Sequence, residues 1–398
     1  MATSRRSSAT DDPAAPDFSL VLGGPLYQLL RRARLTDDVL GMAHRRVLAA
    51  VLFAWAPPVA LAALQGGLVG PGRTIPLAYD IAFHLRFLVV APLLILAELI
   101  VHRRLHPITA QFRVRDLVRA GQAQPFARAT EEAAAGRNSI LAEAILLGLV
   151  YAVGILFTLR RYVGLGPGGW YALPSGGLSL AGFWLVFVSL PLLQFLLLRW
   201  YFRLFLWARF LWRVSRLDLE LEATHPDRAG GLGFLGDSIS AFVPLAAAQG
   251  VLSSGMIADR IFFAGAKVTD FQIEVVGGAV LLLLVFAGPL TLFAIRLARV
   301  KRVGLRDYGA LGQDYVRQFR RKWMSGTSAG EPLVGSGDIQ SLADLGNSYS
   351  AAEQMRLAPI QLRSLLAFLA AFLAPLLPLL LTTMSVEKLV ARLVGIVF

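Results

Sequence analysis

The chain has 398 residues, of which 56% are hydrophobic and 16% are charged, and its mean hydropathy is +0.60. A soluble domain of this length is far less apolar, so the composition predicts a membrane protein. The formal net charge is +13, but the basic residues lie between apolar runs, which favours orientation in a bilayer over nucleic-acid binding. Cysteine is absent, which excludes disulfides, thiolate metal sites and cysteine nucleophiles. Nothing in the sequence indicates a cofactor.

Residues 1–46 are predicted to form a cytoplasmic tail with an interfacial helix. The first residues are polar and lead into no short apolar core with a cleavage site, so no signal peptide is predicted. Between Phe18 and Leu35, leucines recur at helical spacing beside Arg31, Arg32 and Arg34. This pattern is typical of a helix that lies on the inner leaflet.

Seven segments are apolar over about the 20 residues that a spanning helix needs. The predicted spans are residues 47–68, 81–101, 139–159, 183–205, 238–258, 276–297 and 364–384. Six have strong hydropathy, whereas residues 238–258 include several serines and a glutamine. The fold class is therefore all-α: a polytopic transmembrane helical bundle, built mainly by residues 47–297, with cytoplasmic amphipathic helices.

The distribution of Lys and Arg decides whether the weak fifth segment spans the membrane. If it does, 31 of the 39 basic residues lie in the segments on one side and 7 on the other. Short cytoplasmic loops carry this excess, so the N-terminus is predicted inside and the C-terminus outside a bacterial inner membrane. If it does not span, the most basic loop is forced outside.

Residues 298–363 are predicted to form a cytoplasmic insertion of amphipathic helices. Aromatic and apolar side chains recur at helical spacing from Tyr308 to Trp323 among basic residues, which is typical of a helix resting on anionic lipid or on the bundle. Residues 364–398 contain the last span, 364–384, and an amphipathic helix on the outer face.

Polar residues inside predicted spans are candidates for function, because they are costly in lipid. The candidates are Arg86, Gln249 and Ser253. Arg86 either snorkels to the outer headgroups or has a buried partner or anion. In the fifth span, Ala246, Gly250 and Ser254 form a small-residue ridge that indicates close helix packing, so the polar residues beside it either line a cavity or support packing.

A second group of candidates lies at the predicted cytoplasmic mouth of the bundle. These residues are Glu98, His102, His106, Glu143, His225, Asp227, Arg228 and Asp237. Histidines and carboxylates there would suit proton coupling. The i, i+4 spacing of Glu98, His102 and His106 also fits a metal site, but the adjacent arginines disfavour a divalent cation, and no metal is predicted.

The run from Arg199 to Arg216 interleaves arginine with tryptophan and is predicted to form an interfacial girdle. It leads to HPDRAGGLGFLG, which contains the His-Pro-Asp tripeptide of J-domain co-chaperones and the spacing of a dinucleotide fingerprint. Neither motif has its soluble context here. The segment is predicted to be a turn that re-enters the bilayer, with a gating loop or an anion held before the fifth helix as the alternative.

Three segments, HPDRAGGLGFLG, DIQSLADLGNSYSAAEQMR and APLLPLLLTTMSVEKLVARLVGIVF, resemble a family of uncharacterised multi-pass membrane proteins of bacterial genomes. The resemblance covers roughly the second half of the chain. It implies an inner-membrane protein and carries over no catalytic or ligand residue.

The leading functional hypothesis is a transporter or channel-like protein for a small solute or ion. The alternatives are a membrane-embedded enzyme acting on a lipid-linked substrate, and a non-catalytic scaffold. The expected partners are the lipid bilayer, with anionic headgroups at the inner leaflet, and a further copy of the chain in a homo-oligomer. Nucleic acid is not among them.

Overall fold

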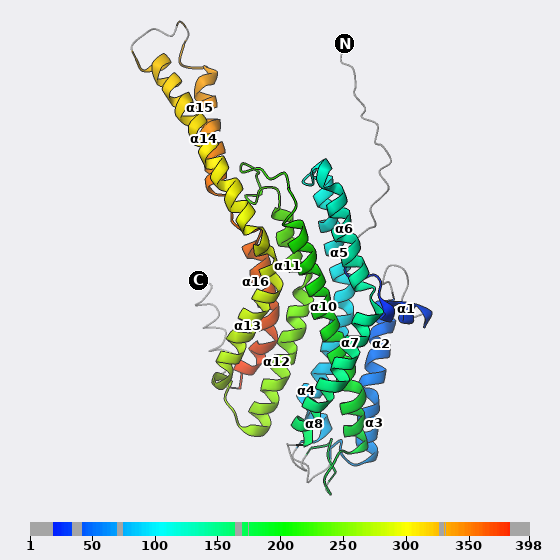
Figure 1. The fold of residues 1–398 in the computed structure, drawn as a ribbon. Coiled ribbons are helices and arrows are strands. Elements are labelled where there is room, and N and C mark those ends of the chain that lie inside the picture. Colours follow the sequence, from blue (N-terminus) through cyan, green and yellow to red (C-terminus); the bar gives the residue numbers. More distant parts are fainter. Residues whose placement is uncertain are drawn as a thin grey trace.

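The computed structural model describes residues 19–33, 42–69, 75–163, 169–173, 175–325, 330 and 332–382. In these residues the regular elements are helices, and β-structure is limited to isolated bridges such as Ile75 with Gly169. The fold is all-α, as predicted (Figure 1). The α-helices are α1 Pro25–Arg32, α2 Ala43–Ala54, α3 Ala56–Leu64, α4 Ile81–Leu85, α5 Ala91–Val114, α6 Ala123–Arg137, α7 Ile140–Leu149, α8 Ile155–Val163, α9 Leu180–Trp184, α10 Leu190–Val214, α11 Asp237–Ala241, α12 Val243–Ala264, α13 Gln272–Ala287, α14 Ala294–Trp323, α15 Gly337–Glu353, α16 Leu362–Leu373 and α17 Leu377–Leu380.

Within the described ranges, seven helical stretches are long and apolar enough to cross a membrane, so the protein is a multi-pass integral membrane protein. They are Ala43–Leu64, Ile81–Val114, Ile140–Leu159, Leu180–Val214, Gly233–Ala264, Val268–Trp323 and Leu362–Leu380. The weak fifth segment is among them, as the charge distribution predicted. Several stretches continue past the predicted span at one end, most clearly the sixth, which runs on into α14.

Three stretches contain a π-helical turn: Arg86–Val90, Val150–Gly154 and Leu185–Ser189. Two of these turns directly precede a proline near the start of the next helix, Pro92 or Pro191. A proline ring clashes with the carbonyl four residues earlier, which here lies inside the wider turn. The third turn ends at Gly154, where a Cβ would lie 2.3 Å from the Gln194 side-chain oxygen. The steric effect of proline therefore accounts for the turns at Arg86–Val90 and Leu185–Ser189.

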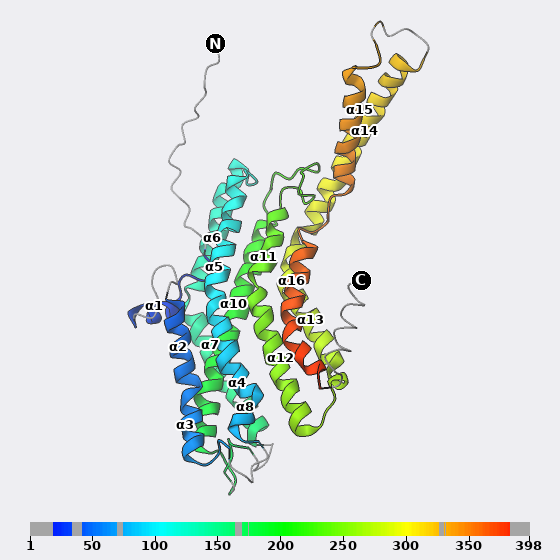
Figure 2. The same ribbon diagram turned by 180° about the vertical axis from the view of Figure 1, so that it is seen from behind.

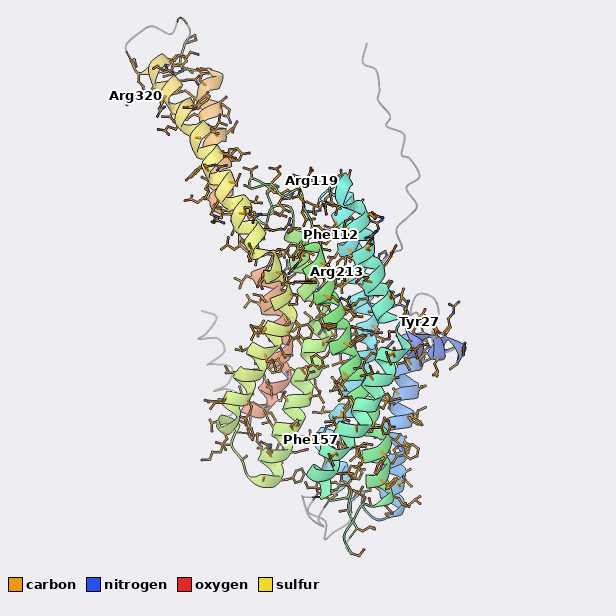
Figure 3. The ribbon with its side chains drawn as sticks, in the orientation of Figure 1. Tyr27, Phe112, Arg119, Phe157, Arg213 and Arg320 are labelled. Carbon is orange, nitrogen blue, oxygen red and sulfur yellow. The ribbon has the colours of Figure 1, made fainter. Side chains whose placement is uncertain are left out.

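The helix α14 continues beyond one end of the bundle, and α15 returns beside it to form a projecting hairpin (Figures 1 and 2). Arg320 lies near its tip, well away from Phe157 at the opposite end of the bundle (Figure 3). The buried residues of α14 are Leu297 and Gly304, and that of α15 is Ala352. The expected insertion is thus a hairpin that points away from the bundle. We call the end from which it emerges the hairpin end.

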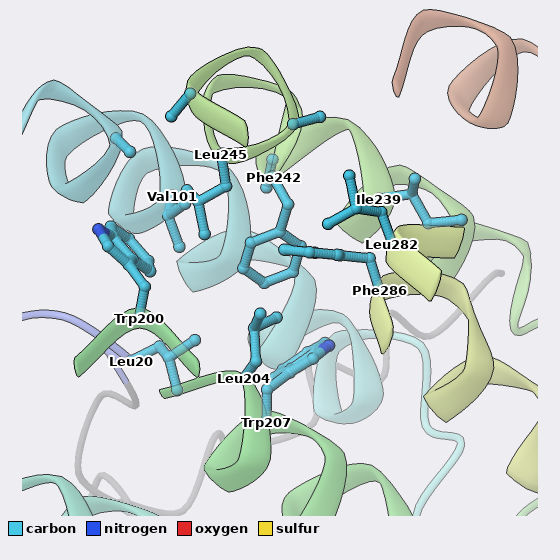
Figure 4. Close-up of a cluster of buried hydrophobic side chains, with 14 of the residues drawn as sticks. Leu20, Val101, Trp200, Leu204, Trp207, Ile239, Phe242, Leu245, Leu282 and Phe286 are labelled. Carbon is cyan, nitrogen blue, oxygen red and sulfur yellow. The ribbon is translucent and has the colours of Figure 1, made fainter. Parts of the chain in front are cut away.

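A continuous apolar core joins the helices that precede α11 to those that follow it. Phe242 at the start of α12 packs on Phe286 of α13 with ring centroids 5.4 Å apart, and Trp200 and Trp207 of α10 lie in the same cluster (Figure 4). Leu20, from the segment before α1, reaches this cluster as well. Residues 19–21 are therefore packed into the bundle.

The predicted small-residue ridge of α12 packs against the last span. A Cβ on Gly250 would lie 2.1 Å from the carbonyl oxygen of Phe372, so only glycine allows this approach. One turn later, the Ser254 hydroxyl donates to the Pro375 carbonyl at 2.7 Å. The ridge thus serves helix packing, as its spacing indicates.

Candidate functional site

Five charged side chains converge inside the bundle. We call them the charge network: Arg46 of α2, Glu98 of α5, Glu143 of α7, and Arg199 and Arg203 of α10. Their side chains are only 3% to 13% exposed. Helices from four separate spans therefore meet at one desolvated ionic site.

Glu98 is the centre of the charge network. Its Oε1 accepts hydrogen bonds from Nη1 of Arg199 and Nη1 of Arg203, each at 2.8 Å. Its Oε2 accepts from Nη1 of Arg46. A carboxylate in a low-dielectric interior is stable only when it is paired in this way. One guanidinium group would neutralise the charge of Glu98, but three guanidinium groups contact it.

Glu143 links the charge network to α1. Its Oε1 accepts from Nε of Arg199 at 3.2 Å, and its Oε2 accepts from the backbone N–H of Leu26 at 2.8 Å. Leu26 is in the first turn of α1, where backbone N–H groups have no partner within the helix. A carboxylate there also interacts favourably with the helix dipole. Glu143 therefore fixes the start of α1 against the bundle.

The segment before α1 covers the charge network from the hairpin end. Leu20 and Val21 are both buried, and the Val21 carbonyl accepts from Nη2 of Arg203 at 3.4 Å. The Ser19 hydroxyl bonds to Nδ1 of His102 at 2.9 Å, and Arg137 donates to the Ser19 carbonyl. These contacts hold residues 19–21 against α5, α6 and α10.

The segment then turns sharply into α1 at two glycines. Gly23 and Gly24 have φ of 127° and 95°, and a Cβ on Gly24 would lie 3.0 Å from Oε1 of Glu143. Other residues rarely adopt such backbone angles. α1 then lies across the direction of the bundle helices, beside the start of α2 (Figures 1 and 2). This orientation fits the predicted interfacial helix, although α1 itself covers only Pro25–Arg32.

The charge network contains one more positive than negative group, since three arginines face two glutamates. Arginine keeps its charge at any accessible pH. The Nε and Nη2 groups of Arg46 are buried and have no hydrogen-bond partner among the described residues. Unpaired buried donors of a charged group are costly, at about 1–3 kcal/mol or more each. The site therefore has both an excess charge and free donors with which to bind an anion.

The predicted group at the cytoplasmic mouth is distributed over separate places. Glu98 and Glu143 join the charge network, while His102 contacts Ser19, and its ring is tilted against that of His106, with ring centroids 5.6 Å apart. The described residues contain no cluster of three His, Asp or Glu side chains close enough to hold a metal ion.

His225, Asp227 and Arg228 lie together in the loop before α11. Asp227 accepts from the backbone N–H groups of Ala229, Gly231 and Gly233 at 2.7–3.1 Å, and its carboxylate is 2.9 Å from Nδ1 of His225. Burial alone would raise the pKa of Asp227, but the three N–H groups and His225 lower it below its ordinary value. The anion in this turn is therefore the protein's own carboxylate.

This loop is also fastened to the segment that leads into the last span. Arg356 donates from Nη2 to the Asp227 carbonyl at 2.8 Å and from its backbone N–H to the Arg228 carbonyl at 2.7 Å. Arg228 itself has φ of 54°. Asp237 begins α11, where its carbonyl accepts from Ser240. The contacts favour the structural-turn interpretation of HPDRAGGLGFLG.

The remaining candidates lie in the spans. Gln249 donates to the Tyr201 hydroxyl at 2.7 Å, and Ser253 lines a cavity of about 170 Å³ together with Arg260 and Glu274. Arg86 opens the first π-helical turn. None of these three side chains contributes to the charge network.

Sequence reasoning missed Arg46, Arg199 and Arg203. The predicted girdle is wrong for residues 199–207, because Arg199, Arg203, Trp200 and Trp207 are all buried. One usable signal is that Arg199 and Arg203 are four residues apart on one helix face, at the same depth as Glu98 and Glu143 on other spans.

The chain was compared with protein-family models, with curated proteins and with solved structures, and none of the three comparisons found a match.

Proposed function

We propose that the protein is a transport-type membrane protein that binds an anion, soluble or lipid-borne, at the charge network. The supporting observation is the pair of buried, unpartnered N–H groups on Arg46, in a network with one excess positive charge. Guanidinium groups bind phosphate and carboxylate through two parallel hydrogen bonds, and an anion at Arg46 would use both free donors.

The ion pairs of the charge network and the helices that carry them support transport more than catalysis. Glu98 and Glu143 are already neutralised by arginines, and arginine does not act as a proton acceptor, so the site offers no free acid or base. The three spans that provide Glu98, Glu143, Arg199 and Arg203 are also the three that contain π-helical turns. Such turns occur frequently at functional sites.

The setting is a further part of the proposal. We assign the hairpin end to the cytoplasmic side of a bacterial inner membrane, because the segments predicted there carry most of the Lys and Arg residues. The charge network then lies at the inner leaflet. An anion would enter from the cytoplasmic leaflet or its surface.

Binding is tested by the thermal stability of the delipidated protein in detergent, with and without inorganic phosphate. At about 100 times Kd, a ligand stabilises the folded state by about 2.7 kcal/mol. Phosphate is expected to raise Tm of the unmodified protein but not of Arg46→Gln. Removing Arg46 leaves two arginines with two glutamates, so the charges of the variant are balanced and it is expected to fold. Arg45→Gln removes the same charge from the adjacent exposed residue and keeps the shift.

Transport is tested with the same proteins in liposomes. Release of entrapped phosphate and exchange of a fluorescent phospholipid between leaflets are measured in parallel. One of the two is expected to depend on Arg46. If phosphate does not raise Tm, and Arg46→Gln destabilises the protein as much as Glu98→Gln, the charge network is purely structural and the proposal fails.

A further inference from the structure

An apolar cavity of about 390 Å³ opens directly from the charge network. Arg46, Glu98 and Arg199 line one part of it, and side chains of α1, α2, α5 and α10 form the rest. This volume falls in the range of about 300–1,000 Å³ that is typical of ligand sites. The cavity therefore combines an ionic end with a long apolar wall.

The apolar wall extends away from the hairpin end into the depth of the bundle. On α2, Phe53 lines the cavity seven residues after Arg46, and on α10, Leu192 lines it seven residues before Arg199. Seven residues of helix correspond to about 10 Å along the axis. α2 runs away from the hairpin end and α10 runs towards it (Figure 1), so Phe53 and Leu192 both lie deeper in the membrane than the arginines.

The helix α1 forms the remaining side of the cavity. Leu26 and Leu30 face it, whereas Arg31 and Arg32 at the end of α1 are exposed. An interfacial helix of this kind places its apolar face towards acyl chains and its arginines at the headgroups. Glu143 of the charge network anchors the start of α1. The helix α1 and the charge network therefore lie at the same level in the membrane.

The charges at the ionic end select among lipid headgroups. The excess charge is a single positive one, which suits a phosphodiester with one negative charge. Both carboxylates are already engaged by arginines, so neither is free to pair with a headgroup ammonium. A lipid with a phosphodiester and an uncharged headgroup therefore fits better than one that also carries an amine.

Resting on the proposed anion site, we propose that its ligand is an anionic glycerophospholipid, with the phosphate at Arg46 and Arg199 and an acyl chain in the cavity beside α1. The phosphate completes the hydrogen bonds of Arg46. The acyl chain covers the apolar wall that lies deeper in the membrane.

Binding is measured by native mass spectrometry of delipidated protein titrated with dioleoylphosphatidylglycerol or dioleoylphosphatidylethanolamine. Phosphatidylglycerol is expected to bind about tenfold more tightly or better. Arg46→Gln is expected to remove this preference, and Arg45→Gln to keep it. Equal affinity for both lipids in the unmodified protein overturns the inference.

A second variant tests the acyl chain separately from the phosphate. Ala50→Phe fills the cavity and keeps all three arginines, whereas Ala60→Phe adds the same group to an exposed position of the same span. Ala50→Phe is expected to weaken phosphatidylglycerol binding about tenfold while inorganic phosphate still raises Tm. Unchanged lipid binding in Ala50→Phe overturns the lipid inference alone. If phosphate does not raise Tm of the unmodified protein, the anion site is overturned as well.

Discussion

The charge network and the α14–α15 hairpin contain the same kinds of ion pair in opposite surroundings. In the network, Glu98 has a side chain 9% exposed and three arginine partners. In the hairpin, Asp338 is 34% exposed and pairs with Lys322 at 2.7 Å. Water can replace the partner of Asp338, but it has little access to Glu98.

This difference determines what each ion pair contributes. Exposed pairs contribute roughly 0–1 kcal/mol, whereas removing one partner of a buried pair costs about 3–5 kcal/mol. Asp227, whose side chain is 18% exposed, lies between the two extremes. The loss of stability on substitution should therefore decrease from Glu98 to Asp227 to Asp338, as the exposure of the carboxylate increases.

The largest effect is expected for Glu98→Gln. The variant leaves Arg46, Arg199 and Arg203 facing the single carboxylate of Glu143, and the expected loss of unfolding free energy is about 3–5 kcal/mol. The measurement is the unfolding transition of the purified protein in detergent. The double variant Arg46→Gln, Glu98→Gln restores the original excess of one positive charge and should recover part of the loss. A single variant as stable as the unmodified protein would mean that water reaches the network.

Asp227→Asn is expected to have an intermediate effect. An asparagine oxygen cannot accept all three backbone N–H groups that the carboxylate accepts, and an unsatisfied buried donor costs about 1–3 kcal/mol. The same unfolding measurement gives the loss. Because Arg356 fastens this turn to the last span, a loss near that of Glu98→Gln would show that the turn organises the bundle as strongly as the charge network does.

The dependence of this effect on pH follows from the lowered pKa of Asp227. The carboxylate binds protons less readily in the folded state than in the unfolded chain, so its contribution is complete at neutral pH and is lost as the pH falls below about 4. The difference in unfolding free energy between the unmodified protein and Asp227→Asn should therefore shrink as the pH falls through this range. A difference that stays constant down to pH 3 contradicts this assignment.

The seven spans could be predicted from the sequence because hydropathy is a property of each segment alone. Even the weak fifth span followed from the distribution of Lys and Arg. The charge network could not, because the sequence places Arg199 and Glu98 at similar depths without showing which faces of their helices meet. An arginine beside Trp200 near a membrane boundary usually lies against headgroups, and only packing shows that here it points inward.

The direction of the hairpin was equally inaccessible to sequence reasoning. The apolar side chains from Tyr308 to Trp323 predicted an amphipathic helix whose apolar face is covered by a lipid surface or by the bundle. In the structure α15 covers it instead, with the Tyr315 hydroxyl donating to the Asp338 carbonyl at 3.0 Å. The amphipathic pattern indicated a buried face but not its partner.

The smallest effect is expected for Asp338→Asn in this hairpin. Hydrogen bonds from Lys322 and Trp323 hold the pKa of Asp338 below its ordinary value, so the pair is formed at neutral pH. Both groups are nevertheless largely accessible to water, which replaces the lost interaction. Unfolding of the bundle should be unchanged, while proteolysis at the tip near Ser325 should be somewhat faster. If instead the bundle loses as much stability as in Asp227→Asn, the hairpin tip is coupled to the membrane domain, and exposure alone does not determine what an ion pair contributes in this protein.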